Sequence, residues 1–110
     1  MDAVIQDAVA RHERYPLSFP IASETRRRAV TIDDIVKVNV EPTNGAGHCS
    51  IWLSIVDVQA ERRPNGKRTY TAHIATLPAH CAWARLEEAV TIEPRHIVDV
   101  YDIATQEPPA

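Results

Sequence analysis

The sequence predicts a small α+β domain that is mostly β: a five-stranded antiparallel barrel or a strongly twisted sheet, with a short N-terminal helix. Three observations lead to this prediction. From residue 31 onward, apolar and polar residues alternate in short runs, as they do in strands that bury one face. Close turns separate these runs, and one turn contains Asn65-Gly66, a pair typical of β-hairpins. Residues 3–13 instead place their apolar residues at helical spacing.

The length of 110 residues suits a single domain, which we expect to span residues 1–104, with a helix and arm over residues 1–30 and a β core over residues 31–104. Residues 105–110 should form a disordered tail. A composition of 45% hydrophobic and 25% charged residues is typical of a globular protein. The net charge of −3 argues against a protein built mainly to coat nucleic acid, because such proteins are usually basic.

No apolar run approaches the roughly 20 residues that span a bilayer, and the N-terminal residues lack the pattern of a secretory signal. We therefore expect a cytoplasmic protein without membrane contact, in a compartment that keeps thiols reduced.

The N-terminal helix should cover residues 3–13, with Asp2 as its N-cap. It should end at Tyr15, because a residue that precedes proline is disfavoured in the helical conformation. Residues 16–23 contain two prolines and are expected to form an extended arm, followed by a solvated turn or short helix over residues 24–30.

The β core should begin after a turn at Asp33-Asp34. In the second strand, the apolar face switches at Ile55-Val56, which indicates a β-bulge or a strand covered on both faces. The five predicted strands cover residues 32–42, 50–59, 68–77, 89–94 and 96–103.

Both cysteines of the chain follow a histidine, in the pairs His48-Cys49 and His80-Cys81. These four residues could supply a zinc site, but adjacent ligands are unusual because neighbours on a strand face opposite sides. A cysteine nucleophile needs a base, and nothing in the sequence marks either thiol as activated. A disulfide would require export, which nothing indicates. We interpret both cysteines as small apolar residues beside strands and expect neither cofactor nor enzymatic activity; a metal or thiol site is the weakest alternative.

The predicted hairpin tip is basic. A β-ribbon with such a tip can grip phosphates, so nucleic-acid binding is the main alternative function. Cations also keep an exposed hairpin from pairing with other strands, and the acidic net charge favours that explanation. The basic run Arg26-Arg27-Arg28 could extend the patch or bind an acidic protein partner. The tip residues are Arg62, Arg63, Lys67 and Arg68.

Aromatic residues and arginines outside the core are common anchors of protein interfaces. On this ground we assign partner binding to Trp83, Arg85, Tyr101, Tyr15 and Phe19. An open strand edge could also pair two copies of the chain into a homodimer.

Three stretches, IDDIVKVNVEP, SIWLSIVDV and VTIEPRHIVDVYD, resemble a known family. They are similar to the opening Gly-Asp strand, the Trp-centred strand and the closing EPxHI segment of small, uncharacterised bacterial β-domains, which include presumed immunity proteins of polymorphic-toxin systems. The chain departs from that pattern at Asp33, which stands in the place of a glycine, in the strand YTAHIATLP, and over residues 1–30.

The resemblance implies a small, non-enzymatic binding module of bacterial or phage origin. Such a module would act as an inhibitor or immunity-type protein by occupying the surface of a protein partner. The same resemblance implies that Trp52 packs in the core and that His96 is hydrogen-bonded at the start of the last strand.

Overall fold

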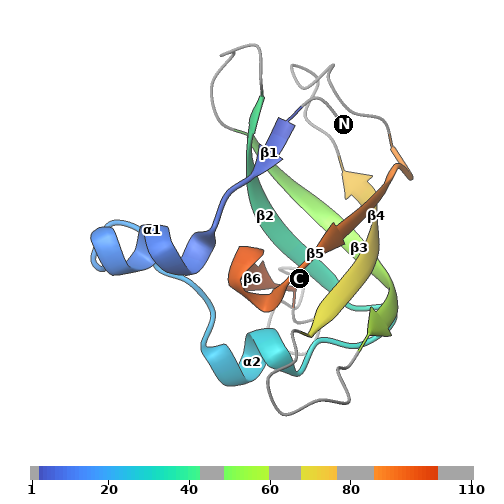
Figure 1. Ribbon diagram of the computed structural model, residues 1–110, viewed down its shortest axis with the longest axis horizontal. Coiled ribbons are helices and arrows are strands. Elements are labelled where there is room, and N and C mark those ends of the chain that lie inside the picture. Colours follow the sequence, from blue (N-terminus) through green and yellow to red (C-terminus); the bar gives the residue numbers. More distant parts are fainter. Residues whose placement is uncertain (1–2, 43–48, 60–67, 77–85, 102–110) are drawn as a thin grey trace, which may run out of the picture.

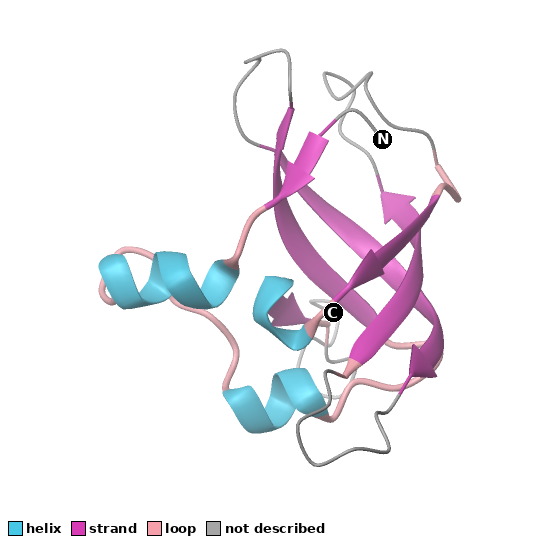
Figure 2. Cartoon of the chain, viewed as in Figure 1, coloured by secondary structure: helices cyan, strands magenta, loops and turns pink. Residues whose placement is uncertain are grey.

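The computed structural model describes residues 3–42, 49–59, 68–76 and 86–101, and the predicted tail, residues 105–110, lies outside them. The described residues form one antiparallel sheet that curls into a half-barrel, with helices beside it (Figures 1 and 2). The elements are β1 (Ala3–Ile5), α1 (Ala8–Arg14), α2 (Glu24–Arg28), β2 (Ile35–Pro42), β3 (Cys49–Gln59), β4 (Thr69–Thr76), β5 (Ala89–Ile92), the 3-10 turn η1 (Pro94–His96) and β6 (Ile97–Val100).

The strand order is β1-β2-β3-β4-β5, and β6 also pairs with β2. Strands β1 and β6 share one edge of β2: Val4 of β1 is the partner of Glu41, and Val100 of β6 is the partner of Val36. Strands β5 and β6 therefore lie at opposite edges of the sheet. The single turn η1 connects them. This architecture confirms the predicted small, mostly β fold with a short N-terminal helix.

The core lies on the concave face of the sheet, because alternate residues of β2, β3 and β4 point inward. Burial of each Val, Leu or Ile side chain contributes about 1.5–3 kcal/mol relative to an exposed one. The central core residues are Val36, Val38, Val40, Ile51, Leu53, Ile55, Tyr70, Ala72 and Ile74.

The apolar switch in β3 coincides with a register shift, which agrees with the β-bulge, one of the two alternatives that the sequence indicates. Ile55 is the partner of Ala72, whereas Asp57 is the partner of the next residue, Thr71, so Val56 is left without a register partner. The extra residue moves the inward-facing set of the strand by one position, and the side chain of Val56 is exposed.

The predicted helix over residues 3–13 is wrong at its N-terminal end. Ala3–Ile5 form β1 because the edge of β2 beyond β6 offers backbone partners, and β-branched residues suit a strand. The helix begins at Ala8, where Asp7 is the N-cap and its Oδ1 accepts a hydrogen bond from the Ala10 backbone N–H at 3.0 Å. The predicted cap, Asp2, lies outside the described residues.

The short second helix and the turn before β2 both agree with the prediction. Ser23 caps α2 by accepting a hydrogen bond from the Arg26 backbone N–H at 3.2 Å. In the turn, Asp34 Oδ2 accepts from the Thr31 backbone N–H at 2.9 Å. Asp33 has a φ of 75°, a left-handed conformation that glycine adopts most easily.

A buried polar network joins α2 to the sheet and to η1. Tyr70 is fully buried, and its hydroxyl donates to the Arg27 carbonyl at 2.8 Å. Arg27 is only 8% exposed, and its guanidinium donates to the carbonyls of Ala22 at 2.9 Å and Pro94 at 3.2 Å. The hydroxyl of Tyr70 also accepts from Arg68 Nε at 3.0 Å. These bonds satisfy polar groups that would otherwise be costly to bury.

The substitution Tyr70→Phe should lower the free energy of unfolding by about 1–3 kcal/mol, because it leaves the buried Arg27 carbonyl without its donor. Urea unfolding followed by circular dichroism measures this loss. The matched control is Tyr101→Phe, which removes a hydroxyl from an exposed ring and should change stability by less than about 0.5 kcal/mol. Equal losses in the two variants would contradict the structural role of the network.

Candidate functional site

The outer face of the sheet carries an aromatic pair. Trp52 of β3 is half-buried and packs edge-to-face on Tyr101, with ring centroids 6.0 Å apart and an interplanar angle of 88°. The Lys37 ammonium lies 5.9 Å from the Trp52 ring centroid. The expectation that Trp52 packs in the core is therefore wrong. Its neighbours Ile51 and Leu53 point inward, so strand alternation directs Trp52 outward.

Cross-strand register extends this pair into a row. Lys37 has Asp99 as its partner on β6 and Trp52 as its partner on β3, and Trp52 in turn faces Thr76 of β4. Partners in register place their side chains on the same face of a sheet. We call this surface, formed by Lys37, Trp52, Asp99 and Tyr101, the outer-face cluster.

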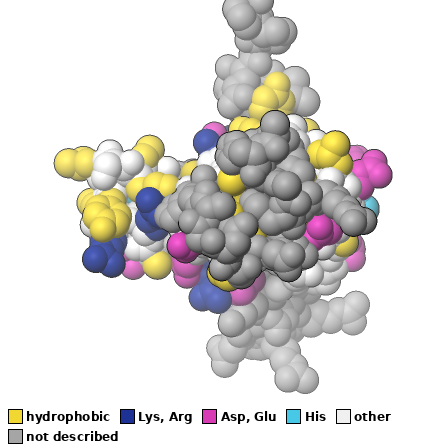
Figure 3. Space-filling view, turned by 90° about the horizontal axis from the view of Figure 1, so that it is seen from above, with side chains coloured by type: hydrophobic (Ala, Val, Ile, Leu, Met, Phe, Trp, Pro, Cys, Tyr) yellow, Lys and Arg dark blue, Asp and Glu magenta, His cyan; other side chains and the backbone are white. Residues whose placement is uncertain are grey.

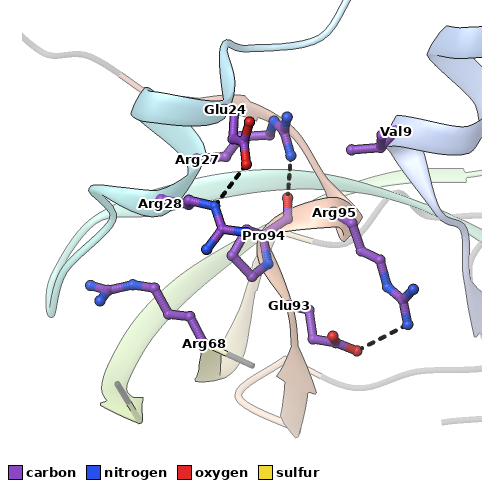
Figure 4. Close-up of a pocket in the computed structure, with 8 residues that line it drawn as sticks. All are labelled: Val9, Glu24, Arg27, Arg28, Arg68, Glu93, Pro94 and Arg95. Atoms are coloured by element: carbon purple, nitrogen blue, oxygen red, sulfur yellow. Dashed lines mark hydrogen bonds and ion pairs between the residues drawn. The ribbon is translucent and has the colours of Figure 1, made fainter. Parts of the chain in front are cut away.

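A second feature is a cavity of about 310 Å³, which we call the basic cleft (Figure 4). It lies where α1, α2, the start of β4 and η1 come together. Its lining residues are Val9, Glu24, Arg27, Arg28, Arg68, Glu93, Pro94 and Arg95. The sequence suggested that the basic run in α2 could join the basic hairpin, and the structure brings Arg27 and Arg28 of that run together with Arg68 in this cleft.

The four arginines of the cleft differ in their partners. Arg28 forms an ion pair with Glu24 at 3.0 Å, and Arg95 lies 3.3 Å from Glu93 and 3.8 Å from Asp7. The other two arginines bond to neutral oxygens in the described part of the chain: Arg27 to two carbonyls, and Arg68 to the Tyr70 hydroxyl and the Val30 carbonyl. Two guanidinium charges of the cleft thus have no carboxylate partner among the described residues.

His96 fixes the η1 wall of the cleft. Its Nδ1 accepts a hydrogen bond from the Glu93 backbone N–H at 2.9 Å. In return, the Glu93 side chain accepts a hydrogen bond from the His96 backbone N–H, which completes a capping box. This confirms the expected hydrogen bond at the start of the last strand. Burial lowers the pKa of His96; the charge of Glu93 opposes that effect, Arg95 adds to it, and Asp7 opposes it weakly.

The residues assigned to partner binding fall into separate groups. Trp83 and Arg85 lie outside the described residues, and Tyr101 belongs to the outer-face cluster. Tyr15 and Phe19 lie at the end of α1 and in the arm, where the guanidinium groups of α1 stack on their rings at 5.5 and 5.0 Å. This part of the chain projects from the sheet, and hydrophobic and basic side chains gather on it (Figures 1 and 3).

Of the four residues at the predicted basic tip, only Arg68 lies in the described part of the chain; Arg62, Arg63 and Lys67 lie outside it. The Arg68 side chain stacks over the ring of Tyr70 at 5.5 Å and lines the basic cleft.

Of the four residues in the metal and thiol alternative, Cys49 is not a free thiol. His48, His80 and Cys81 lie outside the described residues, whereas Cys49 is buried and disulfide-bonded. The interpretation of Cys49 as a free apolar residue is therefore wrong in its bonding state, because the sequence argument excluded a disulfide on the expected compartment alone. A disulfide sulfur supplies no thiolate for a metal or for catalysis. The described residues contain no group of three or more His, Cys, Asp or Glu placed to hold a metal ion.

Comparisons of the chain with protein-family models, with curated proteins and with solved structures find no match. In the described part of the chain, no helix combines the length and the apolar character needed to cross a membrane.

Cys49 should resist alkylation in unfolded protein until a reductant is added, because its sulfur is in a disulfide. Mass spectrometry after iodoacetamide treatment in denaturant, with and without reductant, measures this. Reduction should also lower the free energy of unfolding by about 2–4 kcal/mol. Alkylation of Cys49 without reductant in protein purified under air would rule out the disulfide.

The stability of the chain should depend on pH through His96. Because the pKa of His96 is lowered from 6.5 in the folded chain, the unfolded chain takes up the proton first as the pH falls. The contribution of neutral His96 is therefore complete above pH 6.5 and is lost as the pH falls through the folded pKa.

The variant His96→Asn tests this dependence, because the amide oxygen can accept the Glu93 N–H bond but does not titrate. Urea unfolding between about pH 7.5 and about pH 5.5 should show a steeper loss of stability in the wild type than in the variant. Parallel curves would show that His96 does not produce the dependence.

Proposed function

We propose that this chain is a small, non-enzymatic protein-binding module that acts as an inhibitor or immunity-type protein by occupying the surface of a partner. The observation that carries this proposal is the outer-face cluster. Trp52 is half-buried and Tyr101 is 37% exposed, although both rings lie on a sheet whose opposite face holds the core. Tryptophan and tyrosine are enriched among the residues that dominate binding energy at protein interfaces.

The geometry of the cluster suits recognition of a preformed surface. Trp52 and Lys37 lie within paired strands, and the two aromatic rings orient each other. Side chains held in place before binding lose little conformational entropy on association. The row of Asp99, Lys37 and Trp52 places both signs of charge beside an aromatic ring, a combination that gives a protein interface both contact area and selectivity.

Two local geometries are compatible with the resemblance to the bacterial β-domain family. Asp33, which stands where the family has a glycine, adopts a φ of 75° that glycine favours. His96, at the closing segment, is hydrogen-bonded to the backbone of Glu93. The turn and the closing segment of this chain are thus compatible with the family pattern.

The alternatives receive less support. Arg68 bonds to Tyr70 and Val30 and faces the cleft, which leaves the nucleic-acid alternative dependent on Arg62, Arg63 and Lys67. Cytoplasmic location stays a prediction, and a disulfide at Cys49 is more typical of an oxidising compartment.

The test is capture of a partner from an extract of the native host by the wild-type chain, followed by affinity measurement with variants. The double variant Trp52→Ser, Tyr101→Ser should bind at least about tenfold more weakly, because it removes both aromatic anchors. Circular dichroism should show a retained fold, since neither ring belongs to the core cluster.

The control is Leu17→Ser, which removes an apolar side chain that is 97% exposed in the projecting arm. It should bind as the wild type does. Loss of binding in Leu17→Ser but not in the double variant would move the interface to the arm. Capture that disappears after nuclease treatment of the extract would favour the nucleic-acid alternative.

A further inference from the structure

The basic cleft contains a buried positive charge without a carboxylate partner in the described part of the chain. Arg27 is 8% exposed, and its guanidinium donates to the neutral carbonyls of Ala22 and Pro94. Removing a charged group from water is unfavourable unless a charge of opposite sign compensates it. The folded chain therefore presents a cationic group in a cavity where an anion would be stabilised.

Arg68 supplies a second cation whose orientation is already fixed. Its Nε donates to Tyr70 Oη at 3.0 Å and its Nη2 to the Val30 carbonyl at 3.3 Å, while the guanidinium lies 5.5 Å from the Tyr70 ring centroid. A guanidinium held by two hydrogen bonds and a ring contact loses little freedom when it binds a ligand, and its remaining Nη donors can reach the oxygens of a carboxylate.

The remaining walls limit what the cleft can hold. Glu24 and Glu93 line it as well, each paired with an arginine, and Val9 and Pro94 add apolar surface (Figure 4). Four arginines against two glutamates attract any anion, so charge alone does not distinguish a carboxylate from a phosphate. The apolar surface of Val9 and Pro94 favours a ligand that carries an aliphatic stem, which inorganic phosphate lacks. The cavity of about 310 Å³ has room for a side chain but does not form an extended basic track.

We propose that the basic cleft binds the carboxylate of an aspartate or glutamate side chain on the protein partner. The carboxylate would accept hydrogen bonds from the arginines of the cleft that have no carboxylate partner among the described residues, above all Arg68, and its aliphatic stem would contact Pro94. The identity of the partner as a protein rests on the proposed function, whereas the preference of the cleft for a carboxylate rests on the cleft alone.

The experiment is an NMR titration of the full ¹⁵N-labelled chain, read at the arginine Nε–Hε groups. The probe is the capped peptide acetyl-Gly-Glu-Gly-amide, with its glutamine analogue and inorganic phosphate as comparisons. The glutamate peptide should shift Arg27 and Arg68 saturably, with a dissociation constant on the order of millimolar. The glutamine peptide should produce no such shift, and phosphate should bind more weakly.

The variant Arg68→Gln should weaken peptide binding at least about tenfold, because it removes one of the two cations without a carboxylate partner. The matched control is Arg14→Gln, an exposed arginine that stacks on Tyr15 outside the cleft, and it should bind as the wild type does. If Arg68→Gln does not fold, the comparison of the two peptides on the wild-type chain decides.

Equal shifts with both peptides, or no saturable shift at about 10 mM glutamate peptide, would overturn the proposal. Tighter binding of phosphate would replace the carboxylate with a phosphate group as the ligand. The double variant Trp52→Ser, Tyr101→Ser should still bind the peptide. If a partner is captured but the peptide does not bind, only the inference about the cleft is overturned. If the peptide binds but no partner is captured, only the proposed function is overturned.

Discussion

The hydrogen bond from the buried hydroxyl of Tyr70 to the carbonyl of Arg27 joins β4 to α2 in the interior of the half-barrel. It fixes α2 against β4, and from that position the Arg27 guanidinium reaches the carbonyls at the end of the arm and in η1. The same hydroxyl orients Arg68. Among the described residues, no strand pairing joins β5 to β1 or β6, and this polar link adds a directional connection between α2 and the sheet. This network orients two of the four arginines of the basic cleft, Arg27 and Arg68.

The curl of the sheet separates the residues that form the core from those that we propose contact a partner. Inward-facing residues of β2, β3 and β4 supply the core, so the outward-facing set is under little packing constraint. Exposed faces of antiparallel sheets usually carry small or charged polar residues. A tryptophan that packs on a tyrosine and a lysine at this position contributes little to the core, which is why we assign it to binding.

Most of the fold could be predicted from local patterns, and the failures have identifiable causes. Alternation located the five main strands, and the phase switch located the bulge at Val56. Strand β1 was missed because three residues become a strand only when a neighbouring edge is available, which is a tertiary property. The resemblance implies a core position for Trp52, whereas the alternation of its neighbours Ile51 and Leu53 directs it outward. The sequence suggested that the basic run of α2 could join Arg68, but the contribution of Arg95 could not be predicted because it lies far from both in the sequence.

Helix α2 contacts both of the proposed contact regions, the outer-face cluster and the basic cleft. Arg26 donates from Nη2 to the Val100 carbonyl at 3.2 Å, next to Tyr101, while the following two residues of the helix line the cleft. The Tyr101 backbone N–H donates to the Ile35 carbonyl at 2.8 Å, which fixes the position of Tyr101 relative to β2. A partner that offers an apolar patch alone would contact the outer-face cluster but leave the cleft cations unpaired. A partner that also offers a well-placed carboxylate would contact the outer-face cluster and pair with the cleft arginines. The arrangement therefore favours binding to one specific surface over non-specific binding to apolar surfaces.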